Sequence, residues 1–395
     1  MLDTAPHGGV LIMKSKRFIA LLAAAALILV FASCAPKKPE ITPEPPVTED
    51  KGPNTPDVTA TPAPTPTPTP DPTPEPTPEP TPEPTPTPYN GPTDPLTGLP
   101  VPEDISGKRP ISVMINNLKA ALPQCGVSGA AIIYETLAEG GITRMLAVFS
   151  DVSDIGPIGS VRSSRDYFID LAQGLDAIYI HAGGSPQAYS ALSSRRVTSI
   201  DGLSGSYALF YRDQERLKTY SYEHCLFTSG ELLGKLSDYN LRLEHDEDYV
   251  CPLEFTDDGS PEGGTTASKI SVKFSEYKTG IFEYDESTGL YMVSQYGAAY
   301  TDGNTGMQVG VTNVVIIKTD MWTIRGDDAG RIGVRMTGEG TGWFACGGKY
   351  VPIKWSKASP SDPFIYSLED GDPLVFGRGT TYVNIIPQDQ DPVFD

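Results

Sequence analysis

Among the residues whose type and spacing could form a binding site, a group of arginines is the strongest candidate. Arg162 and Arg165 are three residues apart, follow the loop 156–160, and stand just before or at the start of a predicted helix. Guanidinium groups form paired hydrogen bonds with phosphates and carboxylates, and the backbone N–H groups of a helix N-terminus add to such a site. We therefore predict an anion-binding site here. The alternative is that these arginines form structural ion pairs with the abundant acids.

Residues elsewhere in the first half of the chain are predicted to line the same site. His181 ends an apolar strand and precedes two glycines, which allow a ligand to approach the backbone closely. Ligands of α/β domains bind at the carboxyl ends of strands, where this histidine falls. The alternative for His181 is a buried structural hydrogen bond. The predicted ligand-binding residues are Asn116, Arg144, Arg162, Arg165, His181, Ser185, Arg212 and His224.

The elements that must position these residues divide the chain into two folded parts. Strand-like runs at 111–115, 130–134, 142–149 and 177–180 alternate with a helix-like segment at 163–174, which predicts an α/β domain over residues 94–255. Residues 268–390 contain almost only strand-like runs, which predicts a mostly β domain with a twisted antiparallel sheet or a small barrel. The polar stretch 256–267, rich in glycine, is the predicted linker. The fold class is therefore α+β.

The N-terminus has the pattern of an export signal. An apolar run of 16 residues, 18–33, follows Lys14, Lys16 and Arg17 and is too short for a typical transmembrane helix. Residues 31–34, Phe-Ala-Ser-Cys, resemble the lipobox of bacterial lipoproteins, in which the cysteine is acylated. We predict a lipoprotein signal peptide over residues 1–33, with translation starting at Met13, and palmitate-type lipidation at Cys34 that holds the protein on the bilayer. A retained signal anchor is the alternative.

A proline-rich stalk is predicted to follow the lipidated cysteine over residues 34–93. Of the 38 prolines, 22 lie between Pro36 and Pro92, and every second residue is proline from Thr61 to Pro88. Proline removes a backbone donor, so this disordered segment is expected in extended polyproline II. We interpret it as a spacer that carries the folded part away from the membrane, and the alternative is a ligand for a proline-binding module.

Charge and cysteine content exclude several classes of function. The formal charge of −20, from 50 acidic and 30 basic side chains, argues against a nucleic-acid partner. The cysteines have no metal-binding spacing, no Walker loop or Gly-x-Ser-x-Gly motif occurs, and we expect neither a metal nor another cofactor. Cys225 and Cys251 are the pair most suited to a disulfide, with four free buried thiols as the alternative. A Cys225–His224 dyad is not expected, because adjacent residues of a strand point apart.

Motifs in both halves resemble one family of proteins. The motifs are Pro95–Pro100, Arg109–Asn117, Tyr134-Glu135, Glu139–Arg144, Gly159–Arg165, His181–Ser185, Gly338–Trp343, Val351–Trp355 and Gly379–Pro387. Together they are similar to the YerB-like lipoproteins of Gram-positive bacteria, a family of two fused domains whose biochemical function is not established. The resemblance implies a protein anchored by lipid to the cell membrane, on its extracytoplasmic face.

Two hypotheses of function follow. In the first, the α/β domain binds an anionic ligand of the cell envelope or cell wall, or a protein partner, through the pocket lined by arginine and histidine. In the second, the protein is an envelope enzyme that acts on a phosphorylated or lipid-linked substrate, by loose analogy with the LytR-CpsA-Psr phosphotransferases. Arg162, Arg165 and Asp166 would then correspond to that family's arginines and aspartate. The sequence favours binding and identifies no catalytic residue.

Overall fold

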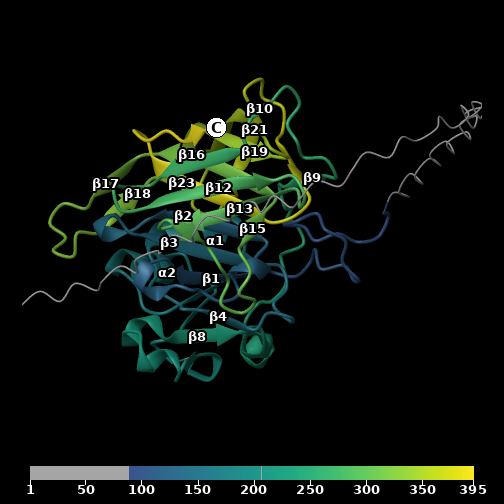
Figure 1. Cartoon of the computed structure of the whole chain (residues 1–395). Helices are drawn as coiled ribbons and strands as arrows, with labels where there is room; N and C mark the ends of the chain where they lie inside the picture. Colours follow the sequence, from purple (N-terminus) through teal and green to yellow (C-terminus); the bar gives the residue numbers. More distant parts are fainter. Residues whose placement is uncertain (1–88, 206) are drawn as a thin grey trace, which may run out of the picture. The chain divides into compact units, whose positions relative to one another are not determined.

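A computed structural model describes residues 89–205 and 207–395 (Figure 1). The predicted signal peptide, Cys34 and all but the last residues of the predicted stalk lie outside this part of the chain. In this part of the chain the α-helices are few and short: α1 (Asp166–Gly174), α2 (Pro186–Ser194) and α3 (Gly230–Leu233). Within the described residues, none of the helices has the length and apolar character needed to cross a membrane.

One large sheet of 11 strands draws on both predicted domains. Its order is β10-β20-β19-β16-β23-β2-β3-β1-β5-β6, and β21 also pairs with β20. From the first half come β1 (Ile111–Asn116), β2 (Ile132–Leu137), β3 (Thr143–Phe149), β5 (Ile178–His181) and β6 (Ser199–Asp201). From the second half come β10 (Thr265–Thr266), β16 (Asn313–Thr319), β19 (Gly338–Cys346), β20 (Lys349–Lys357), β21 (Ile365–Leu368) and β23 (Thr381–Pro387).

The first half has the predicted α/β connections. β1 pairs with β3 in antiparallel fashion and with β5 in parallel fashion, and β6 continues the parallel set. Helix α2 connects β5 to β6. It begins at a good start signal, because the Ser185 hydroxyl accepts a hydrogen bond from the Ala188 N–H and Pro186 occupies the first helical position. The carboxyl ends of β1 and β5 therefore lie at one edge of the sheet.

Strand β23 joins the two halves. It lies between β16 and β2 and runs parallel to both, with Ile133 opposite Tyr382 and Val314 opposite the same residue. The second half is mostly β, as predicted. Its shared sheet with the first half is not foreseen from the sequence, and residues 89–395 fall within a single compact unit. The boundary at 256–267 stays a prediction; in the structure this stretch includes the edge strand β10 and the buried Gly259.

A second sheet has six strands in the order β14-β13-β12-β11-β24, with β15 paired with β13. Its strands are β11 (Lys269–Lys273), β12 (Thr279–Asp285), β13 (Leu290–Gln295), β14 (Ala298–Ala299), β15 (Gly310–Val311) and β24 (Val393–Phe394). Three small sheets complete the described part: β4 (Pro157–Gly159) with β8 (Leu226–Ser229) and β7 (Tyr211–Arg212), β9 (Glu254–Thr256) with β22 (Val375–Gly377), and β17 (Met321–Thr323) with β18 (Ile332–Val334).

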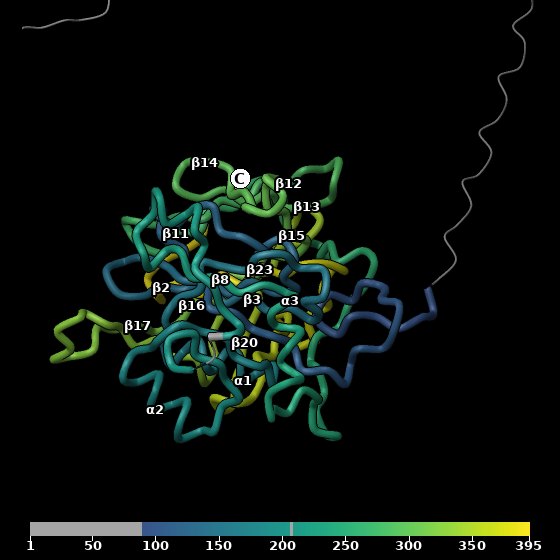
Figure 2. The backbone as a smooth tube through the Cα atoms, turned by 90° about the horizontal axis from the view of Figure 1, so that it is seen from below, coloured from purple at the N-terminus to yellow at the C-terminus, as the bar shows by residue number. Residues whose placement is uncertain are grey.

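Alternating side chains of the large sheet fill two hydrophobic cores. On β1, Val113 and Ile115 point into the core shared with Phe282 and Tyr291 of the second sheet. Met114 points to the opposite core, with Phe168 of α1. Figure 2 shows the resulting layers, with the second sheet on one side of the large sheet and helices α1 and α2 on the other. The predicted site residues Asn116, Arg144 and His181 lie at or next to the ends of strands of the large sheet.

Candidate functional site

Strand register brings the predicted site residues Asn116 and Arg144 side by side. They lie directly opposite each other at the ends of β1 and β3. The segment that carries Arg162 runs along the same strand end, because the Arg162 N–H donates to the Met114 carbonyl at 2.9 Å. Residues far apart in the sequence thus converge at the carboxyl end of β1, the kind of position at which α/β domains bind ligands.

Two of the arginines share one carboxylate. Arg144 Nη2 lies 2.9 Å from Glu139 Oε1, and Arg165 Nε lies 3.0 Å from Glu139 Oε2. A second nitrogen of Arg165 also contacts Glu139 Oε1. Both arginine side chains are buried, at 4 % and 8 % exposure. Of the two arginines for which structural ion pairs were the alternative, Arg162 and Arg165, Arg165 forms such a pair, and Arg144 shares its carboxylate. Glu139 was not among the predicted site residues.

The pKa values of Arg144 and Glu139 are both shifted because positive charges lie close together here. Burial, and then the nearby charge of Arg165, lower the pKa of Arg144 to about 10, against the opposing effect of Glu139. For Glu139, burial by itself raises the pKa, but the charges of Arg144 and Arg165 outweigh it, so the pKa lies below its ordinary value. The carboxylate is therefore ionised, and it compensates one of the two positive charges.

Arg162 adds a third guanidinium that has no carboxylate of its own. Its single hydrogen bond within the described residues goes from Nη1 to the Glu223 carbonyl at 3.2 Å, and its Nε is buried without a partner. Burial, and then the charge of Arg165, lower its pKa, although the carboxylate of Glu223 opposes this effect. Because Arg162 is only half-buried, its unused N–H groups are the part of the cluster that can reach a ligand.

His224 completes the cluster beside Arg162. The Asn116 Nδ2 atom lies 2.8 Å from His224 Nδ1, and the Asn116 side-chain oxygen Oδ1 accepts a bond from the Leu118 N–H. The amide nitrogen of Asn116 therefore donates to Nδ1, which leaves the proton of the neutral imidazole on Nε2. Burial, and then the charge of Arg162, lower the pKa of His224. At neutral pH this side chain is a hydrogen-bond donor without charge.

The remaining predicted residues lie around this cluster in other roles. His181 Nδ1 bonds to the Gly183 carbonyl at 2.9 Å, while its Nε2 is buried without a partner. Ser185 caps α2, so its hydroxyl is already used. Arg212 donates to the Tyr222 carbonyl at 2.7 Å and stacks on the Tyr222 ring, next in sequence to Glu223.

The predicted contribution of a free helix N-terminus is wrong. Helix α1 begins at Asp166, and the carboxylate of Asp166 interacts with the backbone N–H groups of Asp166 and Tyr167. Neither Ser163 nor Ser164 caps the helix, since Ser164 Oγ instead accepts from the Tyr179 hydroxyl. An anion at this cluster would consequently be held by side chains rather than by α1.

The cysteines and acidic residues show no second chemistry in the described part of the chain. Cys125, Cys225, Cys251 and Cys346 are free thiols, so Cys225 and Cys251 do not form a disulfide. The alternative of four free buried thiols is met in part, because only Cys225 and Cys346 are buried. Among residues 89–205 and 207–395, no group of three or more His, Cys, Asp or Glu side chains is arranged to hold a metal ion.

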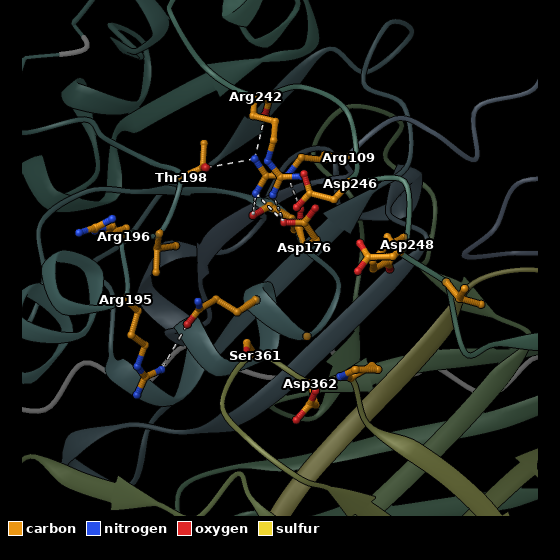
Figure 3. Close-up of a pocket in the computed structure, with 17 residues that line it drawn as sticks. Arg109, Asp176, Arg195, Arg196, Thr198, Arg242, Asp246, Asp248, Ser361 and Asp362 are labelled. Carbon is orange, nitrogen blue, oxygen red and sulfur yellow. Dashed lines mark hydrogen bonds and ion pairs between the residues drawn. The ribbon is translucent and has the colours of Figure 1, made fainter.

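A cavity away from the cluster was missed by the sequence analysis. It has a volume of about 600 Å³ and lies at the ends of α1 and α2, with Arg109, Asp176 and Arg242 on one wall (Figure 3). Its lining residues come from five separate segments of both halves, and none has a recognisable spacing. The only sequence signal was Arg109, which belongs to one of the motifs quoted above.

Three comparisons with known proteins, by family models, by sequence and by structure, give consistent results. The family models described as "Protein of unknown function (DUF3048) N-terminal domain" and "C-terminal domain" match residues 96–241 and 270–383. A curated protein of Bacillus subtilis (strain 168), named "Putative lipoprotein YerB", is 32 % identical over 298 residues, which are 74 % of this chain and 86 % of that protein. A crystal structure of the YerB protein from Bacillus subtilis matches with a TM-score of 0.67 and 29 % identity, over 77 % of this chain and 99 % of that one.

Proposed function

This chain belongs to the two-domain DUF3048 family and is similar to a Bacillus subtilis protein named as a lipoprotein, and from this premise we propose that it binds an anionic group of a cell-envelope molecule at Arg162. The resemblance to the YerB-like family is thus confirmed. Lipidation at Cys34 and an extracytoplasmic location belong to the proposal, and they would place the folded part beside envelope polymers and lipids.

The observation that supports this function is a surplus of positive charge in a protein that is strongly acidic. Arg144, Arg162 and Arg165 lie together, while only Glu139 makes direct ion pairs with them. A half-buried guanidinium that lacks a carboxylate is costly to desolvate, and a bound anion removes that cost. Arg162 uses one of its five N–H groups, so it can present a two-pronged face to a phosphate or carboxylate.

The other members of the cluster have supporting roles in this proposal. Arg144 and Arg165 are fixed by Glu139, so they raise the local potential without moving to meet the ligand. The Nε2–H of His224 supplies a neutral donor close to Arg162. The Glu223 carboxylate also borders the cluster, 3.9 Å from His224 Nε2, and no contact among the described residues specifically supports the phosphotransferase hypothesis.

Isothermal titration calorimetry of the full-length chain with pyrophosphate tests the proposal. We expect saturable binding, and a loss of about tenfold or more in affinity for Arg162→Ala, the effect of removing one hydrogen bond to a charged group. Arg162→Lys should bind more weakly than wild type, because a single ammonium cannot form the two parallel bonds.

Arg325→Ala is the matched control, because Arg325 is an exposed arginine without an ion pair in the described residues. It should bind pyrophosphate as wild type does. The proposal is refuted if pyrophosphate does not bind to the wild type, or if Arg162→Ala binds it as tightly as wild type does.

A further inference from the structure

The cavity at the ends of α1 and α2 has the dimensions of a small-molecule site. Its volume of about 600 Å³ falls within the range of about 300–1,000 Å³ that is usual for ligand pockets. The first half contributes the helix ends and the segment around Asp246, while the second half contributes Ser361, Asp362 and Pro363. Figure 3 shows these groups arranged around a common space. The cavity shares no lining residue with the arginine cluster described above.

One wall of the cavity is held rigid by charges that compensate each other. The Asp176 carboxylate pairs with three side chains. Its Oδ1 atom lies 3.1 Å from Arg109 Nη2 and 2.7 Å from Arg242 Nη2, and its Oδ2 atom lies 3.0 Å from His245 Nδ1. Arg109 also donates to the Arg242 carbonyl at 2.8 Å. These side chains are occupied with one another, so they shape the wall and leave little net charge on it.

The groups left for a ligand are polar and of both signs. Asp248, Asp362 and Arg196 line the cavity, and none of them makes an ion pair within the described residues. In Figure 3 the two aspartates lie apart from Arg196, on different sides of the space. Four arginines and four aspartates line the cavity in total, so their formal charges cancel. Such a lining offers many hydrogen bonds but no preference for an anion or a cation.

The backbone at Arg196 has a conformation that is unusual for a residue with a side chain. Helix α2 ends with a bond from the Val197 N–H to the Leu192 carbonyl, and Arg196 has the left-handed φ of 53°. Glycine is the residue usually found at this position, because a side chain costs backbone energy there. Asp176 has the same conformation at the end of α1, with a φ of 47°. Charged residues thus replace glycine at both helix ends that face the cavity.

We propose that this cavity binds a neutral saccharide. Carboxylate and guanidinium groups form paired hydrogen bonds with neighbouring hydroxyls, and the cancelled charge favours an uncharged ligand. The Tyr249 ring, fixed by stacking on His245 at 3.7 Å between centroids, offers an apolar surface for the C–H face of a sugar ring. The inference is independent of the anion site, because it uses other residues and another class of ligand.

Maltose and N,N′-diacetylchitobiose are the probes, added to the full-length chain in a detergent without a sugar headgroup. Saturation-transfer NMR should show contact with at least one of these neutral disaccharides, and calorimetry should give saturable binding. Asp248→Ala and Asp362→Ala should each weaken that binding by about tenfold, the effect of losing a hydrogen bond to a charged group.

Arg196→Gly separates binding from folding. Glycine suits the left-handed position, so the melting temperature should stay equal or rise while the affinity for the disaccharide falls. Arg325→Ala and Asp328→Ala, both exposed in the β17–β18 hairpin, remove the same charges outside the cavity and should bind as wild type does. The proposal is overturned if neither disaccharide binds, or if all three cavity variants bind as tightly as wild type.

Discussion

The Lys278 ammonium lies 2.9 Å from the Glu135 carboxylate, and both side chains are 1 % exposed. Glu135 belongs to β2 of the first half, and Lys278 belongs to the turn between β11 and β12 of the second half. The pair is therefore a buried ion pair between the two family domains. Burial lowers the pKa of Lys278, and the charge of Glu135 opposes that effect.

Neutral side chains satisfy the remaining hydrogen bonds of this pair. Asn117 donates to Glu135 at 2.7 Å, and the Tyr382 hydroxyl donates to the other carboxylate oxygen at 2.5 Å. Lys278 donates to the Gln295 side-chain oxygen at 2.7 Å. Because both domains contribute partners, the network ties the second sheet to the large sheet at one point.

Removing one partner of this pair should be much more harmful than removing both. Lys278→Met leaves the carboxylate of Glu135 buried without its counter-charge, which should lower the free energy of unfolding by about 3–5 kcal/mol. The double variant Glu135→Gln/Lys278→Met should recover most of that loss. Urea denaturation measures all three proteins. A single variant as stable as wild type, or a double variant no better than the single one, would contradict this account.

Glu139→Gln should affect stability and anion binding in opposite directions. It leaves the buried guanidiniums of Arg144 and Arg165 without a carboxylate, so we expect a loss of about 3 kcal/mol in the free energy of unfolding. The same change increases the positive charge near Arg162, so pyrophosphate should bind more tightly and restore part of the stability. Thermal denaturation with and without pyrophosphate checks both effects. Equal or weaker pyrophosphate affinity in the variant would show that the cluster is purely structural.

Stability should fall as the pH drops below about 6.5, the ordinary pKa of histidine. Burial lowers the pKa of His181, His224 and His245 in the folded protein. Between the lowered and the ordinary pKa the unfolded chain binds more protons, so acid favours unfolding over that interval. His181 has the clearest reason, since its Nε2 is buried without a partner and a proton there would have no acceptor.

His181→Asn tests this dependence. The asparagine amide can keep the bond to the Gly183 carbonyl but does not titrate. We expect the variant to be less stable than wild type at neutral pH and to lose less stability between pH 7 and pH 5, as measured by urea denaturation. An unchanged pH dependence would show that His181 does not contribute to it.

Reducing agent should leave the melting temperature unchanged, because the four described cysteines are free thiols. Burial raises the pKa of Cys125 and of Cys346 to about 11, so neither forms a reactive thiolate at neutral pH. A maleimide should label the folded protein slowly and the unfolded protein rapidly at these positions. A fall in melting temperature on reduction would reveal a disulfide and contradict this prediction.

Much of the fold was determined by the sequence alone. The strand-like runs at 111–115 and in the second half correspond to observed strands. The half-buried character predicted for 111–115 is wrong, because β1 lies inside the large sheet and is covered on both faces. The family resemblance and the convergence of Arg144, Arg162 and Arg165 were also accessible. These features depend on local patterns or on motifs that survive in the linear order of residues.

Only the tertiary structure decided which of those residues already have a hydrogen-bond or ion-pair partner within the protein. Glu139 pairs with Arg144 and Arg165, Asp166 fills the start of α1, and Ser185 caps α2. None of these partnerships follows from spacing, because each depends on the direction of a side chain within a packed layer. The shared sheet, the Glu135–Lys278 pair and the cavity beside Asp176 join segments more than a hundred residues apart or drawn from separate loops. Such long-range pairings are set by the packing of the whole fold, which local sequence patterns do not encode.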